Sequence, residues 1–177
     1  AAHNPFSKTN SKHAIPLPIA AYTDNGRKEI NQDFHACRIP KPNQIMMKGA
    51  VLAMADGISS SQVSQLASET AVKTFLEDYY CTSEAWTVRT SVAKVLAAIN
   101  SWLYTQSQQG EGRYDKDKGY VCTFSAMVFK HRKAHIFHAG DTRVYRLNEQ
   151  GIEQLTHDHR LWVNQQESYL SRALGMQ

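Results

Sequence analysis

No hydrophobic run in the sequence is long enough to cross a membrane. The longest apolar stretch, residues 49–55, is far shorter than the roughly 20 residues that a membrane-spanning helix requires. The start of the chain also lacks the pattern of a secretory signal peptide. We therefore expect a soluble, cytoplasmic segment that makes no contact with a membrane.

Cysteine is scarce as well. The 3 cysteines, Cys37, Cys81 and Cys122, are far apart and form no C-x-x-C pair. This odd number and wide spacing argue against a disulfide framework and against a zinc site. The histidine-rich segment 157–159 is an equally poor metal site, because consecutive residues rarely bind one ion.

The chain carries no concentrated charge of either sign. Its 20 Lys and Arg residues against 16 Asp and Glu residues give a formal net charge of +4. The basic residues are spread over the whole sequence and form no stripe with interleaved aromatic residues. We expect no nucleic-acid partner.

What the sequence does have is enough apolar material for one core. With 177 residues, 42% of them hydrophobic, it can form one domain but hardly two. The polar opening, residues 1–14, is expected to be a flexible tail. Residues 15–177 are expected to form the domain.

The first half of the chain predicts strands followed by two helices. Strands are expected at 15–22 and 33–40, and the apolar run 51–55 is typical of a buried strand that ends at a turn. Apolar and small residues then recur at helical spacing over 63–75, and Ser59 with Gln62 predicts a capping box. A second, antiparallel helix is expected at 84–106.

The second half returns to strands after a charged loop at 110–119. Strands are expected at 120–129, 134–139 and 143–147, joined by connectors short enough for hairpins. A further helix is expected to begin at 170–174. Because strict alternation of strands and helices is absent, the order favours an α+β fold with an antiparallel sheet.

Three short segments carry candidate chemistry. Asp56 and Gly57 follow the buried strand, where a carboxylate and a backbone carbonyl suit Mg²⁺ or Mn²⁺. Arg27 and Asp33 lie on the loop that enters the second strand and could hold a phosphate group and a metal ion. Asp141 lies between two strands and could hold a further cation. Each segment, taken alone, is also compatible with an ordinary turn or a solvated loop.

Together, the segments resemble the PP2C (PPM) family of metal-dependent serine/threonine protein phosphatases. Six motifs occur in family order over about 150 of the 177 residues: R-K-E-I-N-Q-D at 27–33, M-A-D-G at 54–57, C-T-F-S-A-M-V at 122–128, H-A-G-D-T-R-V-Y at 138–145, L-T-x-D-H at 155–159 and R-A-L-G at 172–175. The helix-pair region also resembles the phosphatase half of bacterial phosphatase/kinase fusion proteins.

The resemblance implies an α-β-β-α sandwich of two antiparallel sheets flanked by helix pairs, incomplete at the C-terminus. It also implies a site for two or three Mn²⁺ or Mg²⁺ ions. In that site Asp56 and the Gly57 carbonyl would bind metal directly, Asp33 would act mostly through metal-bound water, and Asp141 would help to hold a third ion. Arg27 would hold the substrate phosphate.

The resemblance further implies hydrolysis of phosphoserine and phosphothreonine in proteins. Two cations lower the pKa of a bridging water, so that a hydroxide can attack phosphorus in line without a phospho-enzyme. The expected partners are phosphorylated proteins and a fused or cognate protein kinase.

Two departures from the family pattern leave a second hypothesis open. Family members carry a later Ser-Asp-Gly strand and an Asp-Asn pair that complete the metal site, and neither occurs in the 177 residues. Residues 58–61 also replace a Gly-rich segment that contains a histidine in some members. The alternative is therefore a catalytically impaired, phosphatase-like regulatory or binding module.

Overall fold

The computed structural model describes residues 17–58, 62–115 and 118–176. The first half contains β1 (Asp33–Arg38), α1 (Pro42–Lys48), β2 (Ala50–Asp56), α2 (Gln62–Cys81), α3 (Val88–Gln109) and the short 3₁₀ helix η1 (Glu111–Arg113). The second half contains β3 (Phe124–Lys130), β4 (Lys133–Ala139), β5 (Tyr145–Asn148), β6 (Gly151–Gln154), β7 (Arg160–Trp162) and β8 (Ser168–Leu170). The fold is α+β, as the sequence predicts.

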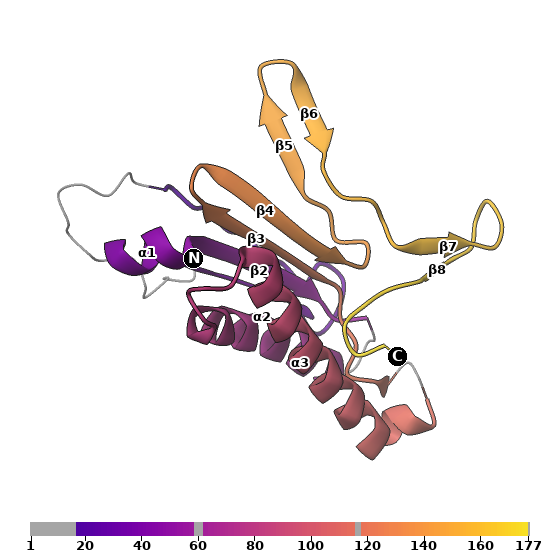
Figure 1. Ribbon diagram of the computed structural model, residues 1–177. Coiled ribbons are helices and arrows are strands. Elements are labelled where there is room, and N and C mark those ends of the chain that lie inside the picture. Colours follow the sequence, from indigo (N-terminus) through magenta and orange to yellow (C-terminus); the bar gives the residue numbers. More distant parts are fainter. Residues whose placement is uncertain (1–16, 59–61, 116–117, 177) are drawn as a thin grey trace.

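The centre of the fold is an antiparallel sheet in the order β1-β2-β3-β4. Its central strands read as apolar runs because their residues are buried against helices. Val51, Ala53 and Ala55 of β2 lie in the core beside Phe124 and Ala126 of β3. Helices α2 and α3 cover this face of the sheet (Figure 1).

Helix α2 packs closely on the sheet because its inner face is built from small residues and one large aromatic side chain. Ala67, Ala71 and Phe75 are each 0% exposed. The Phe75 ring meets the Phe124 ring of β3 edge-on, with the ring centroids 5.1 Å apart. Thr87 caps the N-terminus of helix α3, because its hydroxyl accepts a hydrogen bond from the backbone N–H of Thr90. Helix α3 packs against α2. The predicted helix pair is confirmed.

Two predicted elements are wrong. Residues 17–22, in the segment predicted as the first strand, form no strand, and residues 15–16 lie outside the described part. The helix predicted at 170–174 is absent, because β8 extends to Leu170 and Leu174 then pairs with Cys122 through backbone hydrogen bonds in both directions. Tertiary pairing has replaced the local helix preference there. The Ser59 half of the capping box lies outside the described residues.

The two-sheet sandwich implied by the resemblance is present in part. Within the described ranges, the strands after β4 form two separate antiparallel hairpins, β5-β6 and β7-β8. In Figure 1 the β5-β6 hairpin extends away from the four-stranded sheet. In the part of the chain described, no helix has the length and apolar character needed to span a membrane.

Candidate functional site

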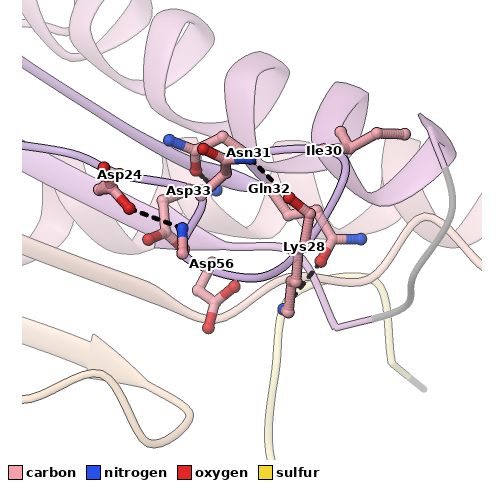
Figure 2. A pocket seen from close by; sticks show the side chains of 9 residues that line it. Asp24, Lys28, Ile30, Asn31, Gln32, Asp33 and Asp56 are labelled. Atoms are coloured by element: carbon pink, nitrogen blue, oxygen red, sulfur yellow. Dashed lines mark hydrogen bonds between the residues drawn. The ribbon is translucent and has the colours of Figure 1, made fainter.

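A pocket lies where β1 begins and β2 ends. It has a volume of about 210 Å³ and is formed by the loop that precedes β1, the first residue of β1 and the last residue of β2. Acidic, basic and amide side chains face it (Figure 2). The lining residues are Asp24, Asn25, Gly26, Lys28, Ile30, Asn31, Gln32, Asp33 and Asp56.

The sheet register places two carboxylates side by side in this pocket. Asp33 of β1 is the direct antiparallel partner of Asp56 of β2. Partial burial and the neighbouring carboxylate of Asp33 raise the pKa of Asp56 to about 6, with a further contribution from the negative charge of Asp141. Lys28 acts in the opposite direction. The site therefore concentrates negative charge that a cation would neutralise.

Gln32 ties the pocket loop to helix α2. The Gln32 side chain is 3% exposed and donates a hydrogen bond of 2.9 Å to the Ser64 hydroxyl. Its backbone carbonyl accepts from the Ser68 hydroxyl at 2.6 Å and from the Gly57 N–H at 3.2 Å. These bonds fix the chain immediately before Asp33, so that the carboxylate pair is held by a buried network.

Gly57 is required by close packing against the same helix. A Cβ atom at this position would lie 2.5 Å from the Ser64 carbonyl oxygen and 2.7 Å from the Ser64 carbonyl carbon. Any larger residue would therefore push β2 and α2 apart. The glycine lets the chain turn out of β2 with Asp56 still facing the pocket.

Thr123 supports Asp56 from the other side. The Asp56 N–H donates to the Thr123 hydroxyl at 3.0 Å, and the Thr123 N–H donates to the Asp56 carbonyl at 2.8 Å. The same hydroxyl shares a hydrogen bond with the hydroxyl of Thr142. Asp56 is thus connected to the turn that carries Asp141.

The structure does not bring all predicted site residues together. Arg27 is exposed and does not line the pocket, whereas its neighbour Lys28 does and donates to the Gln32 side-chain oxygen at 3.0 Å. Asp141 also lies outside the lining and forms an ion pair with Arg160. The roles of Arg27 and Asp141 stay predictions.

The donor chemistry suits a hard divalent cation only in part. The carboxylates of Asp24, Asp33 and Asp56 line one pocket together with amide oxygens, and oxygen is the ligand that Mg²⁺ and Mn²⁺ prefer. Within residues 17–58, 62–115 and 118–176, however, no three His, Cys, Asp or Glu side chains are grouped so that they could hold a metal ion. Asp33 and Asp56 fit as members of a larger ligand set.

Residues outside the predicted set also shape the pocket and support its carboxylates. Asp24 and Lys28 belong to the polar loop before β1, and Thr123 belongs to a strand motif. The signal available in the sequence was their position beside, or within, the motifs that contain Asp33 and Asp56. Side-chain direction in an irregular loop cannot be inferred from residue spacing.

Comparison with known proteins gives a consistent result. The family model described as "Protein phosphatase 2C" matches residues 24–174. The serine/threonine phosphatase stp of Listeria welshimeri is 28% identical over 148 residues, which are 78% of this chain and 53% of that protein. The homologue from Listeria monocytogenes is equally similar. The chain therefore spans about half the length of the curated relatives it matches.

Solved structures show the same fold at lower identity. The serine/threonine phosphatase Stp1 from Staphylococcus aureus matches with a TM-score of 0.67 at 20% identity, over 87% of this chain and 64% of that one. The phosphatase MsPP from Mycobacterium smegmatis, solved in complex with cacodylate, also gives 0.67, at 24% identity over 91% of this chain and 68% of that one.

Proposed function

Because this chain belongs to the protein phosphatase 2C family, we propose that the protein containing it is a metal-dependent phosphatase that hydrolyses phosphoserine and phosphothreonine in other proteins. The observation that carries the proposal is the carboxylate pair Asp33 and Asp56, which the register of β1 and β2 places side by side in one pocket. Such a pair suits divalent cations and, through them, a phosphoryl group.

Each site residue has a proposed task. Asp56 and the Gly57 carbonyl would bind Mn²⁺ or Mg²⁺ directly, and Asp33 would act mostly through bound water. The cations, when bound, would lower the pKa of a water molecule and neutralise charge on the phosphoryl oxygens. Arg27 would turn its guanidinium toward the pocket to hold the phosphate, because its planar fork matches two phosphate oxygens.

The scaffold supports this arrangement without chemistry of its own. Gln32 and Thr123 hold the backbone on either side of the carboxylate pair through short hydrogen bonds, so the two carboxylates need little reorganisation when a cation binds. We further propose that the complete protein contains the second packed sheet of the family sandwich. Phosphorylated proteins in the cytoplasm would be its substrates, and a fused or cognate kinase its counterpart.

The experiment that tests the proposal is Mn²⁺-dependent hydrolysis of a phosphothreonine peptide by the complete protein. The Asp56→Asn variant keeps the size of the side chain but removes its charge, and we expect activity to fall by about two orders of magnitude or more. Asp78→Asn, the same change on the exposed side of α2, is the matched control and should be as active as the unaltered protein. Equal activity of both variants would contradict the proposed site.

A second candidate function is favoured by the ion pair of Asp141. Its carboxylate is engaged by Arg160, which reduces the acidic residues available for metal. A catalytically impaired regulatory or binding module would bind the phosphopeptide without hydrolysing it. The same assay, combined with a binding measurement by fluorescence anisotropy, separates the two functions.

A further inference from the structure

Asp141 is held by a cation that belongs to the chain itself. The Arg160 guanidinium, at the start of β7, forms an ion pair with the Asp141 carboxylate through Nη1. The side chains are 32% and 27% exposed, so the pair is partly shielded from water. The Arg160 Nε also donates a hydrogen bond of 2.9 Å to the Ser168 hydroxyl of β8, which anchors the guanidinium from a second side.

Hydrogen bonds between two backbone segments hold Asp141 and Arg160 near each other. The segments 140–144 and 155–159 run side by side, with the His159 N–H bonded to the Gly140 carbonyl and the Leu155 N–H bonded to the Val144 carbonyl, both at 2.8 Å. The Gly140 N–H in turn donates to His159 Nδ1 at 3.1 Å. Arg160 follows His159 directly and therefore reaches Asp141.

Asp141 belongs to the electrostatic surroundings of the pocket. Its negative charge acts on Asp56, and its neighbour Thr142 is hydrogen-bonded to the threonine that supports Asp56. Any positive charge fixed at Asp141 therefore offsets part of the negative charge around the carboxylate pair. Arginine supplies such a charge at every pH at which the protein is folded.

We propose that Arg160 takes the place of a divalent cation at Asp141, so that this carboxylate does not bind a metal ion in the resting protein. A cation arriving at Asp141 would have to displace the guanidinium from Asp141 and would be repelled by it. This inference rests on the proposed function, because it concerns a cation position of the same proposed site. It assigns Arg160 a positioning and charge-compensating role.

The test counts Mn²⁺ ions bound to the complete protein by equilibrium dialysis, followed by metal analysis. With Arg160 intact, Asp141→Asn should leave the number of bound ions unchanged. The Arg160→Gln variant should bind one further ion, and its affinity for that ion should be about tenfold or more above that of the unaltered protein. Combining Arg160→Gln with Asp141→Asn should remove that additional ion.

The matched control is Arg143→Gln. Arg143 forms the neighbouring ion pair, with Asp158, across the same two segments, and its Nη2 lies 2.6 Å from the carboxylate. Its removal should not change the number of bound ions. A gain of an ion in this control, as in Arg160→Gln, would show a general charge effect and would overturn the proposal.

Two further results would overturn it. One is loss of a bound ion in Asp141→Asn while Arg160 is intact, and the other is a folded Arg160→Gln that gains no ion. If Arg160→Gln does not fold, crystals of the unaltered protein soaked in Mn²⁺ provide the test. An anomalous peak at Asp141 would contradict the proposal, and the absence of a peak there would support it. Failure of the proposed function is distinct, since it would leave Mn²⁺ binding unaffected by Asp56→Asn.

Discussion

At the residue scale, the pocket depends on carboxylates that the fold holds near one another at a cost. Asp56 is partly buried beside Asp33, and the loss of solvation together with the neighbouring carboxylate raises its pKa to about 6. A protein gains nothing in stability from such an arrangement. The hydrogen bonds from Gln32 and Thr123 to the surrounding chain maintain it, as is typical of sites arranged for ligand binding.

Gly57 gives the first residue-scale prediction. In Gly57→Ala the added Cβ would overlap the Ser64 carbonyl group, at 2.5 Å from its oxygen. We expect the free energy of unfolding to fall by about 1–3 kcal/mol in urea denaturation. Gly110→Ala is the control, because its nearest neighbouring atom would be 3.5 Å away, and its effect should stay within about 0.5 kcal/mol. Equal effects of the two substitutions would refute the packing argument.

The second prediction concerns Arg27 and Lys28 in the loop before β1. If Arg27 holds the phosphate, Arg27→Ala should raise KM for a phosphopeptide by about tenfold or more, since a charged hydrogen bond is lost. Lys28→Ala should have a smaller effect, because a lysine contacts phosphate through a single point charge. Steady-state kinetics on both variants decide the matter. A rise in KM confined to Lys28→Ala, the residue that lines the pocket, would reassign the phosphate contact to Lys28.

At the element scale, tyrosine hydroxyls near the C-terminal end of α2 form hydrogen bonds to the β1-β2 connection. Tyr79 donates to the Lys48 carbonyl and Tyr80 to the Gly49 carbonyl, each at 2.8 Å. The Lys48 ammonium, with a side chain 4% exposed, donates back to the Thr82 hydroxyl at 2.7 Å and to the Ser83 carbonyl at 2.9 Å. These bonds satisfy polar groups that would otherwise be buried without partners. They also set the position of β2 relative to α2.

The buried hydrogen bond of the Tyr79 hydroxyl predicts a loss of stability at alkaline pH. Burial raises the pKa of Tyr79 to about 12, from about 10 in an unfolded chain. The folded state therefore favours the neutral hydroxyl, and this stabilisation is complete below pH 10 and is lost as pH rises toward 12. The stability difference between the unaltered protein and Tyr79→Phe should shrink by about 1–2 kcal/mol between pH 9.5 and 11.5.

Urea unfolding at each pH measures this difference. Tyr114→Phe is the control, because Tyr114 is 87% exposed and is not one of the two tyrosines that bond to the β1-β2 connection. Its stability difference from the unaltered protein should stay constant over the same pH range. A constant difference for Tyr79→Phe as well would show that the Tyr79 hydroxyl titrates as in an unfolded chain.

Helices and strands could be predicted where their own sequence shows an apolar run or a regular spacing of apolar residues. The apolar run at 51–55 predicted β2, and helical spacing predicted α2. Helix α1 and the strands β6 to β8 were missed, because these elements are only three to seven residues long and hold little periodicity. The segment at 170–174 was misread as a helix because its pairing with Cys122 is a long-range contact.

At the scale of the whole molecule, the sheet register carries sequence motifs into one site. Asp33 and Asp56 belong to separate motifs, and antiparallel pairing of β1 with β2 brings them together. The Asp141–Arg160 contact was not predictable, because it joins residues 19 positions apart through pairing of two irregular segments. The motifs therefore indicate which residues to consider for the site, while the charges around those residues depend on contacts visible only in the fold.

The proposed activity requires a cation to bind between Asp33 and Asp56, which the sheet brings together from two motifs. Diffraction from crystals of the complete protein grown with Mn²⁺, recorded at the manganese absorption edge, tests this most directly. We predict an anomalous peak in the pocket, about 2.1 Å from a carboxylate oxygen of Asp56 and on the side that faces Asp33. Manganese bound only elsewhere, with no peak beside Asp56, would contradict the account.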